Sequence, residues 1–440
     1  MGKTLNFKAA LLGGVLFVAT MNAAQAADLL DDVTALLASH ERIRAAEADL
    51  AAAAANEDVA RGGYYPTVSA TVNYGNETIA THAQQTNGAA QTHTTTSYQF
   101  NETDLSVSQL LYDFGSTDAQ VDSAGLTVSQ SRATLEQTRQ AILLEALSAQ
   151  FNLASAKRVL DYQQKSEDSI KRQTELENAR VERGSGFSTD VLQAKTQLAG
   201  AQAARVRADG ALKKSLNRYR AVFGKLPDDM SGLELPKLAN VALPGSEEDL
   251  VDTALDQNPQ VVVAAIAAQI ADQAVKQSFA DGYRPVVNAV AEQKWKDSVA
   301  GTKGQKNETV MKVEASFDFN MGWTAANTLK ASKSGHSAAT SRLKDTRDQI
   351  EEQARNAWQA LETTKANAEF LKNQANIASE FLELARKERK LGQRSLIDVL
   401  SGETSLINAQ AAADRAETDV AIAVLTVLNV MGKLDTSVLQ

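Results

Sequence analysis

Apolar residues recur at helical spacing over long stretches of this chain. The longest run steps by four and three residues for five heptads, which is the pattern of a coiled-coil seam. Alanine fills many seam positions, so neighbouring helices can approach closely. Shorter seams of the same kind run from Ile142 to Leu160 and from Leu406 to Val430. The longest seam consists of Ile350, Ala354, Ala357, Leu361, Thr364, Ala368, Leu371, Ala375, Ala378, Leu382 and Ala385.

A period of two marks the strongest strand. Its polar positions are Lys312, Glu314, Ser316, Asp318 and Asn320, so one side is polar and the other apolar. This pattern suits a membrane barrel whose outside meets lipid and whose inside is wet. We therefore predict a lipid-facing row that consists of Met311, Val313, Ala315, Phe317 and Phe319.

The first half contains a similar but weaker strand pair. Val68, Ala70, Val72 and Tyr74 alternate with polar residues after Pro66, which ends the preceding helix. The Thr/Gln/Ala/Gly-rich stretch 78–96 is predicted to be an exposed loop, and 105–114 a second strand.

The chain repeats itself once. The sequence GFSTDVLQAKTQLAGAQ at 186–202 matches GQRSLIDVLSGETSLINAQ at 392–410, with an offset of about 208 residues. We predict a first repeat at 27–223, with helix 28–62, strand hairpin 64–115, long helix 116–183, tip turn 184–189 and helix 190–223. A linker at 224–246 precedes the second repeat at 247–434, with helix 247–281, strand hairpin 284–322, long helix 323–390, tip turn 391–397 and helix 398–431. A tail at 435–440 follows.

The first 26 residues resemble a signal peptide. Lys3 and Lys8 precede a short apolar run, and Ala24-Gln25-Ala26 forms a small-residue cleavage site. Removing these two lysines takes the net charge from −9 to about −11. An acidic, exported protein has no electrostatic footprint for nucleic acid.

The composition excludes several kinds of active site. The chain has no cysteine, and its four histidines are scattered without metal-ligand spacing. There is no nucleophile elbow, phosphate loop or paired-carboxylate motif, so we predict neither an enzyme nor a bound cofactor or metal. No window is long and apolar enough for a membrane-spanning helix.

The element lengths restrict the architecture. A helix of about 70 residues is on the order of 105 Å long, and each long helix returns along two shorter ones. Four strands cannot close a membrane barrel, since the smallest have about eight, and open edges are not tolerated in lipid. The chain is therefore expected to oligomerise with cyclic symmetry. The alternative is a periplasmic structural or adhesive coiled-coil protein without channel activity.

Together these motifs resemble the TolC family of outer-membrane channel proteins. The resemblance is carried by the duplicated turn, by Gln109-Leu-Leu-Tyr-Asp-Phe-Gly115 at a strand end and by Ala254-Leu-Asp-Gln-Asn-Pro259 opening a helix. It implies a mixed, mainly α fold: a homotrimer with one twelve-stranded β-barrel, four strands from each chain, continued by an α-helical tunnel through the periplasm. It also implies a periplasmic adaptor, an inner-membrane ABC or proton-driven transporter, and a role in drug efflux or type I protein secretion.

The resemblance also assigns residues at the two turns. Thr189, Asp190, Arg394 and Asp398 match positions that close the periplasmic entrance in the family. The residues that match the tip gripped by the adaptor are Gly184, Gly186, Phe187, Leu391 and Gly392. The chain departs from close relatives at Arg389, where they have an aromatic latch, and at Ser401, where they have a second acidic ring.

Overall fold

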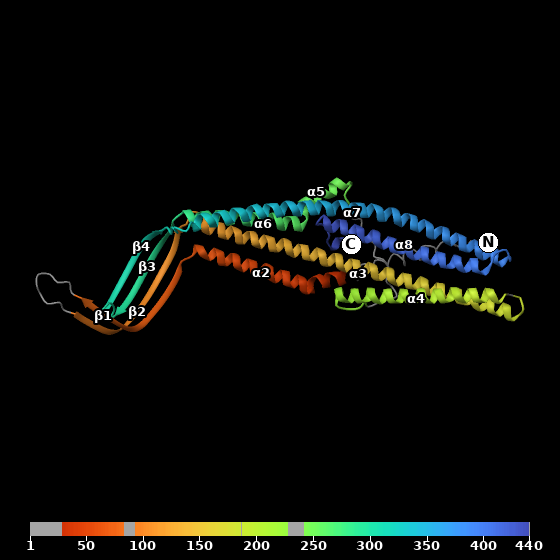
Figure 1. Ribbon diagram of the computed structural model, residues 1–440, viewed down its shortest axis with the longest axis horizontal. Helices are drawn as coiled ribbons and strands as arrows, with labels where there is room; N and C mark the ends of the chain where they lie inside the picture. Colours follow the sequence, from red (N-terminus) through yellow and green to blue (C-terminus); the bar gives the residue numbers. More distant parts are fainter. Residues whose placement is uncertain (1–28, 83–92, 186, 228–241, 440) are drawn as a thin grey trace, which may run out of the picture. The chain divides into compact units, whose positions relative to one another are not determined.

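The computed structural model describes residues 29–82, 93–185, 187–227 and 242–439 (Figure 1). The predicted signal peptide, Gly186 and most of the predicted linker lie outside these residues. After a helix at 29–39, the elements are α2 (Glu41–Arg61), η1 (Gly62–Tyr64), β1 (Thr67–His82), β2 (His93–Tyr112), α3 (Ser116–Glu182), α4 (Ser188–Phe223), α5 (Glu247–Gln257), α6 (Pro259–Tyr283), β3 (Val286–Asp297), β4 (Gln305–Ser316), α7 (Thr324–Lys390), α8 (Leu396–Val430) and η2 (Thr436–Leu439).

The chain forms two compact units, and each unit takes segments from both sequence repeats. The first contains Met1–Glu47, Ala133–Val262 and Asp345–Gln440, and is helical throughout its described part. The second contains Ala48–Arg132 and Val263–Lys344, and holds all four strands that the structure describes. None of the helices in the described ranges is long and apolar enough to cross a membrane.

The two predicted helices at 28–62 and 247–281 are each broken, and the prediction of continuous helices was wrong there. The first breaks at His40, whose Nδ1 accepts a hydrogen bond from the Arg42 amide at 3.1 Å. The second breaks at Asn258, which is held extended (φ −64°, ψ 125°) because Pro259 disfavours a helical conformation before it. Its side chain accepts from the Gln260 amide at 2.8 Å and donates to the Val430 carbonyl at 2.8 Å.

The strands form one antiparallel sheet in the order β1-β2-β3-β4, so β1 and β4 are its edges (Figure 1). The predicted loop at 78–96 was wrong at both ends, because β1 extends to His82 and β2 starts at His93. These ends are rich in threonine, whose β-branched side chain favours strands even where the sequence is polar. Residues 83–92 lie outside the described part of the chain.

The predicted strand at 311–321 also needs a correction. β4 ends at Ser316, which pairs with Val286 at the start of β3. The residue before Val286 is Pro285, which has no amide hydrogen with which to extend the ladder. Phe317 and Phe319 therefore lie beyond the strand, although both remain exposed.

The helical seams form the core of the first unit. In α3, Ile142, Ala146 and Leu153 are fully buried, and in α7 Ile350 and Leu361 are as well. The remaining positions of the α7 seam are buried or half-buried. The two chain ends meet in one apolar cluster, in which Leu434, Val438 and Leu439 pack with Leu29, Val33, Leu143, Leu147, Phe151, Leu425 and Leu428.

A charged cluster joins three helices of this unit. Glu145 of α3 accepts two hydrogen bonds from Arg42 of α2, at 3.2 and 2.7 Å, and lies 3.4 Å from Arg218 of α4. The hydrogen bond and the charge of Arg42 hold the pKa of Glu145 below its usual value of 4.5. The stabilisation is therefore present above about pH 4.5 and is lost as the pH falls through the lowered folded-state pKa.

We predict that Glu145→Gln lowers the free energy of unfolding by about 1 kcal/mol at pH 7. The difference between variant and wild type should shrink below about pH 4.5, because the unfolded-state carboxylate takes up a proton there and the folded-state carboxylate does so at its lower pKa. Chemical unfolding at pH 7 and pH 3.5 measures this difference. An equal difference at both values would contradict the assigned role of the charge.

Candidate functional site

Apolar side chains of all four strands share one exposed face of the sheet. The registers align Val68 with Val107, Val107 with Ala291, and Ala291 with Met311. Met311 is 82 % exposed and Tyr74 is 73 % exposed, so nothing in the described chain covers this face. The face consists of Val68, Ala70, Val72, Tyr74, Leu105, Val107, Val287, Ala289, Ala291, Trp295, Met311, Val313 and Ala315.

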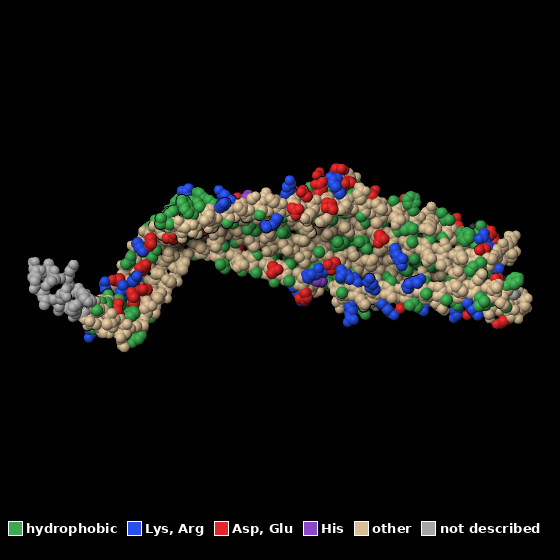
Figure 2. Space-filling model, in the orientation of Figure 1, with side chains coloured by type: hydrophobic (Ala, Val, Ile, Leu, Met, Phe, Trp, Pro, Cys, Tyr) green, Lys and Arg blue, Asp and Glu red, His purple; other side chains and the backbone are tan. Residues whose placement is uncertain are grey.

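The opposite face of the same sheet carries ion pairs. Lys296 of β3 lies 3.3 Å from Glu102 of β2 and 3.1 Å from Glu308 of β4, which ties three strands together. Lys312 and Glu314 pair at 2.6 Å farther along β4. Charged side chains gather over the strands in Figure 2. An exposed sheet with one apolar and one charged face separates an apolar medium from water.

Exposed hydrophobic side chains gather where the sheet joins the helices (Figure 2), and several of the residues there are aromatic. Tyr112 and Phe114 lie 4.6 Å apart between ring centroids, and the Arg284 guanidinium stands 5.5 Å from the Phe114 ring. Tyr65 and Trp323 are about as exposed as the sheet face itself, at 71 % and 70 %. Bands of exposed aromatic residues typify the interface between membrane and water.

The two helix-end turns have the same backbone geometry. Gly184 and Gly392 both have positive φ, 78° and 76°, which favours glycine. In the first turn the Gly184 amide donates to the Val181 carbonyl, and in the second the Gly392 amide donates to the Arg389 carbonyl. The predicted tip residues Phe187 and Leu391 are 75 % and 73 % exposed. Each turn thus presents a large apolar side chain to the surroundings.

The structure does not pair Arg394 with Asp398 among the described residues. The Arg394 guanidinium bonds Glu388 at 2.6 Å and lies 5.3 Å from the Phe381 ring centroid. The Asp398 amide donates to the hydroxyl of Ser395, the N-cap of α8, at 3.2 Å. The two predicted second-turn residues are close in sequence, but the Arg394 side chain pairs with Glu388 instead of Asp398.

The structure does bring Asp190 close to the second turn. A small cavity is lined by Asp190 and Gln193 of α4 and by Ser395, Leu396 and Ile397 at the start of α8. Thr189 is exposed in the first turn of α4 beside it. The two turns are therefore neighbours within one chain, as an entrance built from both requires.

The structure contains an ion pair between two helices at this end that was not predicted from the sequence. Glu177 of α3 is buried, with a side chain 6 % exposed, and Arg389 of α7 donates to it at 3.0 Å. Arg389 also donates to the Arg394 carbonyl at 3.3 Å. Glu177 follows the buried Ile170 and Thr174 at steps of four and three. This seam spacing in the sequence could have indicated that the Glu177 carboxylate is buried. We call this pair the Arg389–Glu177 clamp.

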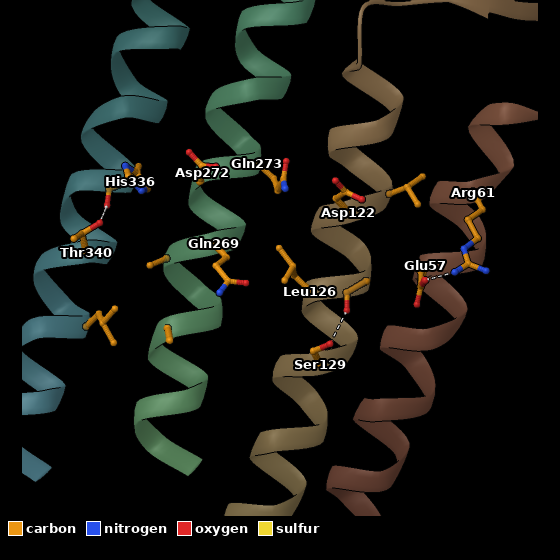
Figure 3. Close-up of a pocket in the computed structure, with 15 residues that line it drawn as sticks. Glu57, Arg61, Asp122, Leu126, Ser129, Gln269, Asp272, Gln273, His336 and Thr340 are labelled. Carbon is orange, nitrogen blue, oxygen red and sulfur yellow. Dashed lines mark hydrogen bonds and ion pairs between the residues drawn. The ribbon is translucent and has the colours of Figure 1, made fainter. Parts of the chain in front are cut away.

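A hollow in the second unit lies between α2, α3, α6 and α7. Figure 3 shows Glu57, Asp122, Asp272 and His336 around it, each from a different helix. The interactions drawn there stay within single helices, such as the Arg61–Glu57 ion pair at 2.5 Å. Across the described ranges, no three metal-ligating side chains gather. The hollow is an open part of the helical wall.

Comparisons with known proteins agree with this geometry. The family description "Outer membrane efflux protein" matches residues 33–225. The outer membrane efflux protein BepC of Brucella suis is 27 % identical over 75 % of this chain and 72 % of its own length. The outer membrane protein TolC of Escherichia coli is 22 % identical over 93 % of this chain and 83 % of its own length.

The chain is similar to the TolC family of outer membrane efflux proteins. The solved outer-membrane channel OprN has the same fold, with a TM-score of 0.76 and 19 % identity over 94 % of this chain and 91 % of that one. These relatives are named as outer-membrane efflux or channel proteins.

Proposed function

We propose that three copies of this chain form the outer-membrane exit duct of a tripartite export system. The observation that carries the proposal is the sheet, which has an exposed apolar face, a charged face and two edge strands. Strand edges left open in lipid would leave backbone N–H and C=O groups without hydrogen-bond partners. Pairing β4 of one copy with β1 of the next satisfies both edges, and three copies give twelve strands, an ordinary size for such a barrel.

In this proposal the helices continue the barrel as a passive tunnel through the periplasm. The entrance is closed at the two turns, with Thr189, Asp190, Arg394 and Asp398 as gate residues. The glycine turns and their exposed Phe187 and Leu391 are the surface that a periplasmic adaptor would grip, together with Gly186. The exposure of both apolar side chains and the nearness of Asp190 to the start of α8 support these roles.

The energy for transport would come from an inner-membrane ABC or proton-driven transporter joined through the adaptor. The name of BepC describes an efflux protein, which favours drug efflux. Type I protein secretion is the second cargo class that the family resemblance implies.

The proposal is tested first on the purified protein. Outer-membrane fractions should contain a heat-modifiable trimer, and that trimer should form single channels in a planar bilayer. A monomer without conductance would refute the duct. Deletion of the gene then separates the cargo classes: new sensitivity to toxic small molecules with an unchanged secretome indicates efflux, and loss of a secreted protein with unchanged sensitivity indicates secretion.

A further inference from the structure

The C-terminal half of α4 carries a basic stripe along one exposed side. At helical spacing this side consists of Arg207, Gly210, Ala211, Lys214, Asn217, Arg218 and Ala221, and all seven residues are exposed. The side contains no acid. Glycine and alanine between the cations leave room for another element to approach closely.

Two cations of this stripe have no charged partner within the described chain. Other basic residues of α4 do pair: Lys213 with Asp209 at 2.7 Å, and Arg205 with Glu167 at 2.5 Å. Arg207 and Lys214 form no ion pair with any residue that the structure describes. Such unpaired cations on a single side suit an acidic surface on a second molecule.

The outward face of α5 is the complementary surface. Leu250, Val251 and Ala254 bury the inner face of this helix. The outer face presents four exposed carboxylates that have no basic partner among the described residues, namely Glu248, Asp249, Asp252 and Asp256. Glu247 anchors the helix to α7, where it accepts from Arg355 at 2.8 Å and from Gln359 at 3.0 Å.

These two surfaces lie on opposite sides of the first unit. Figure 1 shows α4, α3, α8 and α7 side by side, with α4 at one side and α7, carrying α5, at the other. Such an arrangement cannot bring α4 against α5 within one copy. In a closed ring, however, the α4 side of each copy meets the α7 side of the next.

The two surfaces also lie at similar distances from the helix-end turns. At 1.5 Å per residue, Arg218 stands about 45 Å from the start of α4. Gln359 and Arg355, which hold α5, stand about 47 and 53 Å from the end of α7. Nearer the turns each side exposes a large apolar side chain: Val206 is 59 % exposed at about 27 Å and Phe370 is 72 % exposed at about 30 Å.

We propose that the basic stripe of α4 binds the acidic face of α5 on the neighbouring copy. This inference rests on the proposed ring of three copies, and it identifies the contact that holds adjacent copies in one register. Apolar contacts between the two sides tolerate sliding along the helix axes, whereas opposed charges do not. The charge contact therefore sets the register of adjacent copies and rejects contacts between like sides.

Charge reversal tests the contact in the full-length protein. Arg207→Glu with Lys214→Glu should raise the dissociation rate of the purified trimer at least roughly tenfold, and Asp252→Lys with Asp256→Lys should do the same. Combining all four replacements should restore most of the wild-type trimer lifetime, because opposite charges face each other again. The readout is the loss of trimer with time on gentle gels in mild detergent.

The matched control is Lys165→Glu with Arg172→Glu, two exposed cations seven residues apart on α3, which has helices on both sides. It should leave the trimer lifetime unchanged. If the α4 reversal behaves like this control, or if the α5 reversal fails to rescue it, the contact is refuted while the trimer stands. If the wild-type protein is not a trimer, the proposed duct fails first and this inference falls with it.

Discussion

Replacing Val313 with arginine is expected to prevent the protein from assembling in the outer membrane. Val313 is 69 % exposed on the apolar face of β4, between Met311 and Ala315 in the register. In the proposed barrel this face meets hydrocarbon, where an arginine near the midplane costs about 2–4 kcal/mol. Each trimer would carry the charge three times. The yield of heat-modifiable trimer in outer-membrane fractions measures the effect.

The matched control is the same substitution at Val310. This valine lies on the same strand but on the charged face, where the register opposes it to Glu292. Val310→Arg should give nearly normal trimer yield, because its side chain would reach the wet interior and a carboxylate. Equal yields from the two variants would mean that the sheet does not separate lipid from water as proposed.

The long helices and their core were predictable because their signal is long and regular. A seam sustained from Ile350 to Ala385 averages over many residues, so local exceptions do not hide it, and its positions are the buried ones in α7. The duplication was equally clear, and the structure extends it to the backbone: the bonds around Gly184 recur around Gly392. Residues near both ends of the described chain also pack in one apolar cluster.

Strand ends were not predictable from local pattern. Alternation predicts which side a residue faces, but the length of a strand depends on whether its neighbour offers a partner. β4 stops at Ser316 because Pro285 gives it none, although Phe317 and Phe319 continue the alternation. The polar ends of β1 and β2 pair with each other despite a composition that resembles a loop. In both cases pairing with the neighbouring strand overrides the local signal.

The positions of the two helix-end turns could be predicted from the sequence, whereas the roles of their residues remain proposals. The glycine turns and the exposed Phe187 and Leu391 could be identified from their motif. The ion-pair partners could not be identified from the motif, because they depend on which side chains come together in the folded chain. Arg394 bonds Glu388 six residues earlier, and Arg389 bonds Glu177 on another helix. Arg389, where the sequence departs from the pattern that the resemblance implies, thus forms an ion pair with a buried carboxylate.

Removing the Arg389–Glu177 clamp is therefore expected to loosen the entrance. Arg389→Met takes from Glu177 its 3.0 Å partner and leaves only Arg180, at 3.5 Å, beside a carboxylate that is 6 % exposed. Leaving a buried charge without a close partner should lower the free energy of unfolding by about 3 kcal/mol. It also frees the end of α7 from α3, so single-channel conductance in a planar bilayer should rise.

A second variant distinguishes an effect on the closed entrance from a general loss of fold stability. In Arg389→Met with Glu177→Gln, position 177 no longer carries a buried charge, so most of the lost stability should return. The conductance should stay high, because the link between α3 and α7 is still absent. Lys387→Met removes an exposed pair with Glu383 within α7 and should change neither quantity. Wild-type conductance in both Arg389 variants would show that the clamp supports the fold but does not hold the entrance closed.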